Sequence, residues 1–63
     1  MHDLPRSIGR PATGALVHAG IESLDQLTGV TEAWVLGLHG VGPKAVGILR
    51  DALAAQGKTF RPG

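Results

Sequence analysis

Apolar residues recur at helical spacing in two stretches of the chain. In the first, four small or aliphatic residues follow the i, i+3, i+4, i+7 spacing that places side chains on one helix face. They are Ala12, Ala15, Leu16 and Ala19. Pro11 suits the first helical position, where its missing N–H is not needed, and Gly20 suits the left-handed position after a helix. The pattern predicts a helix over residues 11–19.

The second stretch lies in the last third of the chain and has a longer apolar stripe. Its members are Ala45, Ile48, Leu49, Ala52 and Leu53. Pro43 precedes the stripe and Gly57 follows it, which again matches the usual start and end of a helix. We therefore predict a helix over residues 43–56.

Two shorter helices are predicted between these by their capping residues. Ser23, with Gln26 three residues later, has the spacing of a capping box, which favours a helix over residues 24–27. Thr31 suits the N-cap of a helix over residues 32–37.

The predicted fold class is all-α, because no stretch alternates between apolar and polar residues as a half-buried strand does. We expect a compact domain over residues 1–57, with four helices in two pairs of one shorter and one longer helix. Trp34 is expected to be core or partly buried. Residues 58–63 are expected to form a frayed polar tail from which Phe60 can pack back.

Length and composition favour a small binding module. A 63-residue chain buries only ~60% of its unfolded surface, so it has little room to enclose a catalytic pocket, and we expect no enzyme. With 43% apolar and 17% charged residues, it is expected to fold. It has no cysteine for disulfides or zinc, and no apolar stretch long enough to span a membrane. Without a secretory signal at its start, a cytoplasmic location is the expectation.

Charge is distributed unevenly along the chain. The formal net charge is +1, but residues 21–42 carry three acidic side chains and no lysine or arginine, whereas residues 43–63 carry four basic side chains against one aspartate. Such polarity can align a molecule on a polyanion, or can be ordinary solvated charge.

The segment with the clearest chemical signal is residues 36–45, between the third and fourth predicted helices. Gly40 and Gly42 allow positive φ and close approach of a ligand to the backbone, and Pro43 and Lys44 follow at a helix start. Free amides, the positive end of a helix and a lysine together favour a bound phosphate. The alternative is a tight turn that needs glycine for geometry alone.

The starts of the two longer helices carry cations where acidic residues are usual. Arg10 precedes Pro11, Lys44 follows Pro43, and Arg6 lies nearby in sequence, whereas both shorter helices have an acidic residue in the first turn. An anion at each long helix would explain the difference, although both cations could simply point into solvent.

Residues 38–45 resemble the helix-hairpin-helix motif, apolar-x-Gly-apolar-Gly-Pro-Lys-x, of DNA repair and replication proteins. The wider chain, residues 4–60, resembles the C-terminal domain of the bacterial RNA polymerase alpha subunit. The shared positions are Leu16, Ile21, Leu24, Leu27, Thr31, Glu32, Val41, Gly42 and Lys44. The resemblance implies a tandem helix-hairpin-helix fold with two pseudo-symmetric hairpins. It also implies binding to the DNA backbone along the minor groove without sequence-specific reading of the major groove.

The resemblance carries a set of DNA-binding positions onto this chain. They are Gly40, Val41, Gly42, Lys44 and Ala45 in the hairpin, with Arg10 and Arg6 near the first helix. Some hairpins of this type also hold K⁺ or Na⁺ on backbone carbonyls, and the matching positions are Leu36, Leu38 and Val41. No other cofactor is implied, and the three histidines, His2, His18 and His39, lack the spacing of metal ligands.

The chain departs from the alpha-subunit pattern at several positions. Arg10 stands one residue earlier than the family's arginine, Gly14 replaces a polar amide side chain, and Ala45 replaces a serine. The first hairpin, at residues 19–21, lacks a second glycine. These departures weaken the case for promoter recognition and leave general backbone binding.

Three alternatives to stand-alone DNA binding stay open. The domain could bind another protein through its acidic residues 21–42 after losing DNA binding, could form a homo-oligomer, or could anchor a separate nuclease or polymerase on DNA.

Overall fold

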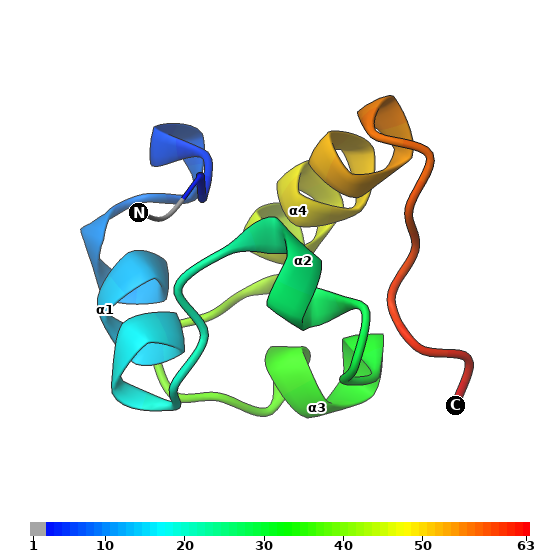
Figure 1. The fold of residues 1–63 in the computed structure, drawn as a ribbon. Helices are drawn as coiled ribbons and strands as arrows, with labels where there is room; N and C mark the ends of the chain where they lie inside the picture. The colour runs from blue at the N-terminus through cyan, green and yellow to red at the C-terminus, as the bar shows by residue number, and fades with distance from the viewer. Residues whose placement is uncertain (1–2) are drawn as a thin grey trace.

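The chain forms four α-helices and one turn of 3-10 helix around a shared apolar core (Figure 1). The computed structural model describes residues 3–63, so His2 lies outside the described residues, which contain no strand. The elements are η1 (Arg6–Ile8), α1 (Arg10–His18), α2 (Leu24–Leu27), α3 (Glu32–Leu36) and α4 (Pro43–Ala55). The predicted all-α fold of four helices is confirmed, with every helix boundary within one residue of its predicted position. No helix in this part of the chain is both long and apolar enough to cross a membrane.

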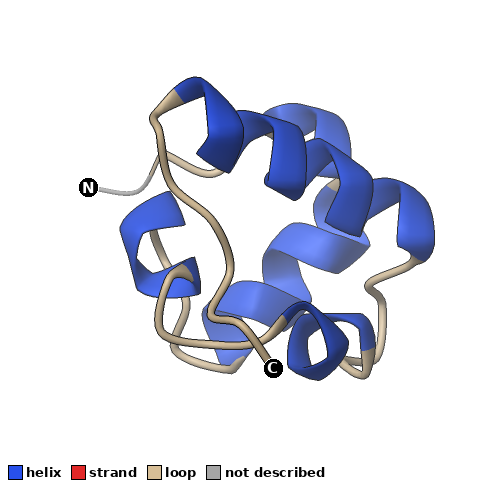
Figure 2. Cartoon of the chain, turned by 90° about the vertical axis from the view of Figure 1, so that its right-hand side faces the viewer, coloured by secondary structure: helices blue, strands red, loops and turns tan. Residues whose placement is uncertain are grey.

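The longest helix, α4, is the element against which most others pack. It contacts η1, α2 and α3, while α1 contacts η1. Five side chains at the centre of the core are essentially inaccessible to solvent: Leu16, Leu27, Val35, Leu49 and Leu53. The C-terminal tail runs along the side of the molecule opposite α1, and Figure 2 shows the same tail in front with α1 behind.

The two short helices begin with the side-chain caps that the sequence predicts. The Gln26 amide donates to Ser23 Oγ at 3.4 Å, and the Ser23 amide donates to Gln26 Oε1 at 3.0 Å. At α3, the Trp34 amide donates to Thr31 Oγ1 at 3.1 Å. These bonds satisfy amides that have no partner within the helix.

The two long helices end in the same way, each at a glycine with positive φ. Gly20 has φ 89° and Gly57 has φ 71°. Beyond them, the Ile21 amide donates to the Leu16 carbonyl at 2.8 Å, and the Lys58 amide donates to the Leu53 carbonyl at 2.9 Å. This is the Schellman pattern, and it confirms the helix ends expected from both glycines.

The residues before α1 contribute to the core, although the sequence pattern did not predict it. Leu4, before η1, and Ile8, its last residue, are both buried. The Leu24 amide donates to the Asp3 carboxylate at 2.7 Å, and this bond holds the pKa of Asp3 below its ordinary value. The start of the chain is therefore attached to α2.

The tail also packs back, whereas one residue expected in the core does not. Phe60 is buried and the Arg61 amide donates to the Val30 carbonyl at 2.9 Å. Trp34, by contrast, is 43% exposed, which corrects the expectation that it is core or partly buried. In the short helix α3, only Val35 is buried.

Candidate nucleic-acid interface

The second hairpin reverses the chain in six residues, between Leu36 and Pro43. After α3, the Val41 amide donates to the Leu38 carbonyl at 3.1 Å and closes a four-residue turn. Gly40 is the third residue of this turn and has φ 98°, the position at which a type II turn favours glycine. Gly42 then forms the N-cap of α4.

The two hairpin glycines have different roles, which corrects the expectation that both provide positive φ. Gly42 has φ −111° and ψ 176°, an extended conformation open to any residue, and a Cβ added there would meet no atom within 4 Å. A Cβ added at Gly40 would lie 2.9 Å from the Pro11 carbonyl oxygen. Gly40 is therefore needed for the turn and for close packing against α1, while Gly42 leaves open space at the start of α4.

In residues 39–45, five amides have no hydrogen-bond partner among residues 3–63: those of His39, Gly40, Gly42, Lys44 and Ala45. All except His39 are positions to which the helix-hairpin-helix resemblance assigns DNA binding. The next amide along the chain, that of Val46, donates to the Gly42 carbonyl and begins the regular bonding of α4. The start of α4 thus offers amide donors and the positive end of a 13-residue helix.

Both long helices begin in the same manner, and differently from the short ones. The N-caps of α1 and α4 are Gly9 and Gly42, neither start has a side-chain cap, and neither has an acidic residue in its first turn. By contrast, α2 and α3 have side-chain caps and an acidic residue in the first turn. The contrast expected from the sequence is therefore present in the structure at all four helix starts.

The start of α1 lies against the second hairpin, because Gly40 approaches the Pro11 backbone closely. Beside it, Arg6, Gly9, Arg10 and Thr13 line a surface hollow of ≈ 460 Å³. The hollow places two of the predicted DNA-binding cations, Arg6 and Arg10, on one side of the molecule. The other cation, Lys44, follows the hairpin as the second residue of α4.

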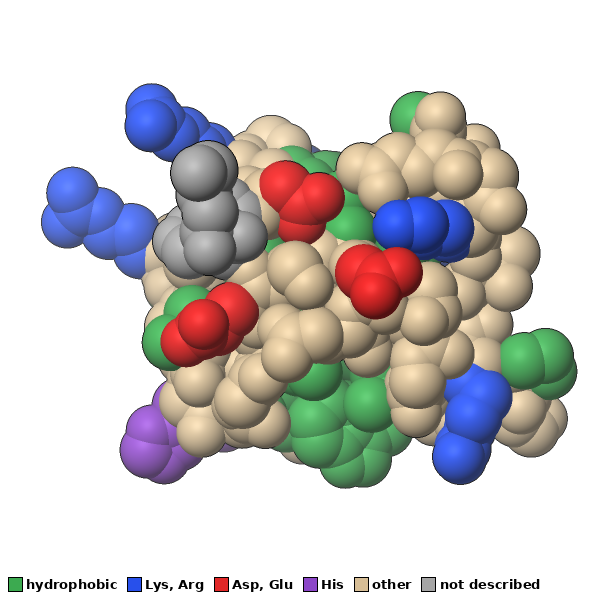
Figure 3. All heavy atoms as spheres, viewed as in Figure 1, with side chains coloured by type: hydrophobic (Ala, Val, Ile, Leu, Met, Phe, Trp, Pro, Cys, Tyr) green, Lys and Arg blue, Asp and Glu red, His purple; other side chains and the backbone are tan. Residues whose placement is uncertain are grey.

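Ion pairs divide the basic residues into two groups. Arg50 Nε lies 2.7 Å from Glu32 Oε1, and Lys58 Nζ lies 3.2 Å from Asp25 Oδ1. Among residues 3–63, the three cations at the predicted site have no such partner: they are Arg6, Arg10 and Lys44. In Figure 3, Lys and Arg side chains project from the edge where η1 and α1 lie and from the opposite edge, with acidic side chains on the face between them.

The first hairpin offers no comparable set of donors. Its Gly20 amide donates to the Val17 carbonyl at 3.0 Å, and its Ile21 amide is bound to Leu16 as described above. The helix that follows, α2, is capped by Ser23 and bonded to Asp3. The missing second glycine therefore coincides with a hairpin whose amides are used within the fold.

The carbonyls expected around a monovalent cation belong to Leu36, at the end of α3, and to Leu38 and Val41, in the turn of the second hairpin. The Leu38 carbonyl accepts the Val41 amide, and no such bond is made by the carbonyls of Leu36 and Val41 among the described residues. A carbonyl has two lone pairs, so all three retain capacity for a further interaction.

Comparison with known proteins adds no family to this description. No family model matches the chain, and no curated protein or solved structure matches it either.

Proposed function

We propose that this chain is a non-enzymatic DNA-binding domain of the tandem helix-hairpin-helix type. The second hairpin, residues 40–45, binds backbone phosphates along the minor groove with its free amides and Lys44, and shows little preference for sequence. Arg6 and Arg10 bind a second stretch of backbone from the start of α1.

The observation that carries the proposal is that the amides of Gly40, Gly42, Lys44 and Ala45 have no partner in residues 3–63. The first amides of a helix have no acceptor within it, and a phosphate oxygen is a good acceptor for them. The packing of Gly40 on Pro11 supports the proposal further, because it brings the second uncapped helix start beside the first.

The salt dependence of DNA binding tests the electrostatic part of the proposal. Three unpaired cations neutralise roughly three phosphates, so log affinity should fall with log salt with a slope of about −2.7. Between ~50 and ~200 mM salt, affinity should drop about forty-fold, or ~2 kcal/mol. In fluorescence anisotropy titrations, Lys44→Ala should weaken binding about equally for different duplex sequences and reduce the slope by about one.

A substitution at Gly42 separates binding from folding. In Gly42→Asp the new carboxylate has open space, caps the free amides of α4 and stabilises the helix by up to ~1 kcal/mol. The same carboxylate occupies the proposed phosphate site, and hydrogen bonds to a charged group contribute about 1.5–3 kcal/mol each, so DNA affinity should fall at least about tenfold. The expected variant is therefore more stable and binds less.

Ser23→Asp is the matched control, since it makes the same change of charge at the N-cap of α2. It should retain most of the DNA affinity. Equal losses in the two variants would show that overall charge alone determines binding. Full affinity in Gly42→Asp, or binding that does not respond to salt, would reject the hairpin site and favour a protein-binding role for the domain.

A further inference from the structure

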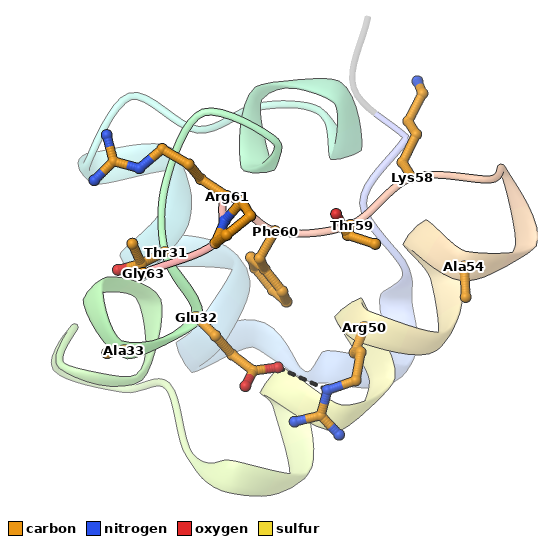
Figure 4. A pocket seen from close by; sticks show the side chains of 11 residues that line it. Thr31, Glu32, Ala33, Arg50, Ala54, Lys58, Thr59, Phe60, Arg61 and Gly63 are labelled. Carbon is orange, nitrogen blue, oxygen red and sulfur yellow. Dashed lines mark hydrogen bonds and ion pairs between the residues drawn. The ribbon is translucent and has the colours of Figure 1, made fainter.

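A groove of ≈ 660 Å³ lies beside the C-terminal tail, and none of the residues that line it belongs to the proposed DNA interface. One wall is the C-terminal tail, residues 58–63, and the others are the start of α3 and the outer face of α4 (Figure 4). Figures 1 and 2 agree that the tail and α1 lie on opposite sides. A ligand in this groove would leave the α1 edge free.

The groove combines an apolar lining with an excess of positive charge. Ala33, Ala54 and Pro62 contribute apolar surface, and the Phe60 ring points between the tail and α4. Three cations line it: Arg50 and Lys58, which pair with Glu32 and Asp25, and Arg61. Arg61 has no ion pair among the described residues, and the Arg50 side chain is still 61% exposed beside Glu32.

The tail, residues 58–63, runs along the side of the molecule as a loop with no partner strand among the described residues. Residues 58–63 contain no helix or turn, Phe60 is buried, and Thr59 and Arg61 on either side of it are exposed. Only the amides of Lys58 and Arg61 in this segment donate to another described backbone group. An extended segment with unpaired amides and carbonyls can pair with a second extended chain.

We propose that this groove binds an extended acidic peptide of a partner protein. An apolar side chain of that peptide lies against Ala54 and Phe60, and its carboxylates face Arg61 and the exposed side of Arg50. A polyphosphate fits less well, because it would gain nothing from the apolar lining that Ala33, Ala54 and Pro62 provide. The proposal goes beyond DNA binding and does not depend on it.

To test the proposal, a short peptide of alternating leucine and glutamate is titrated into the 63-residue protein. Binding is followed by the change in NMR chemical shift of the backbone amides. Ala54→Glu places a carboxylate in the groove, whereas Ala55→Glu places one on the adjacent exposed residue, outside the lining. Like charges in an interface are strongly unfavourable, so Ala54→Glu should weaken peptide binding at least about tenfold. Ala55→Glu should bind nearly as the wild type does.

Two control probes complete the test. A peptide with glutamine in place of glutamate should bind more weakly, and single-stranded oligo-thymidine should not shift the amides of Thr59 and Arg61. The proposal is wrong if the acidic peptide gives no saturable shifts along residues 58–63, or if the two alanine variants bind it equally. Shifts there with oligo-thymidine alone would identify the groove as a nucleic-acid site and would also overturn the proposal.

Discussion

Replacing Gly40 by alanine should destabilise the domain far more than the same change at Gly42. At Gly40 the backbone has φ 98° and the new Cβ would lie 2.9 Å from the Pro11 carbonyl oxygen, closer than such contacts allow. The unfavourable conformation costs about 1–3 kcal/mol and the contact adds to it. The loss of glycine's freedom in the unfolded chain offsets ~0.4–1 kcal/mol. A net destabilisation of about 2 kcal/mol follows.

At Gly42 the corresponding terms nearly cancel. Its extended backbone and open surroundings accept a methyl group. Alanine is a poorer N-cap than glycine, but the unfolded chain again loses freedom. Gly42→Ala should therefore leave stability close to that of the wild type.

Thermal unfolding followed by far-ultraviolet circular dichroism measures the difference. A domain of this size loses about 4–8 °C in melting temperature per kcal/mol, so Gly40→Ala should melt about 8–16 °C lower. Equal melting temperatures for the two variants would refute the distinction between a packing glycine and an open one. They would also contradict the close contact between Gly40 and Pro11 that places the start of α1 beside the second hairpin.

Three further predictions concern the caps and the surface. The hydrogen bond from the Leu24 amide lowers the pKa of Asp3, so the ionised carboxylate stabilises the folded protein. Above pH 3.8, the wild type should therefore melt at a higher temperature than Asp3→Asn, and this difference should be lost as pH falls through the folded-state pKa of Asp3. Ser23→Ala removes a reciprocal cap and should reduce the free energy of unfolding in urea by about 0.5–2 kcal/mol, and a loss below this range would show that α2 needs no cap. Arg50→Ala breaks an exposed pair with Glu32 and should cost about 0–1 kcal/mol in the same assay, with a larger loss contradicting the weak pair.

The features that could be predicted from the sequence are those set by residues close together in the chain. Ser23 and Gln26 form their capping box within one helical turn, and Gly20 and Gly57 end their helices by their own backbone conformation. The short-range pattern is sufficient for such features, because the interacting groups are brought together by the helix itself.

Features that depend on distant contacts were missed or misassigned. Asp3 binds the amide of Leu24, far along the chain, and nothing near Asp3 indicates that partner, although the four-residue spacing of Leu4 and Ile8 was a usable sign of a further turn. Trp34 was misplaced because only Val35 of α3 is buried, and the apolar character of the neighbouring residues does not indicate which of them the fold covers.

The hairpin motif indicates where the candidate site lies in the sequence, but it does not predict the backbone geometry within the site. The sequence shows Gly40 and Gly42 as equivalent members of one hairpin. Only the fold shows that the Pro11 backbone packs closely against Gly40, whereas a side chain at Gly42 would meet no atom within 4 Å. The roles of the two glycines therefore depend on tertiary packing.

The attachment of both chain ends to the core has a consequence for how the domain opens. Chain ends usually fray, and their amides exchange with solvent long before those of the interior. Here Leu4 and Phe60 are buried, and the Arg61 amide is bonded to Val30. Releasing the tail would expose Phe60 and break this bond, so the hydrogen on the Arg61 nitrogen should exchange more slowly than that of a frayed chain end.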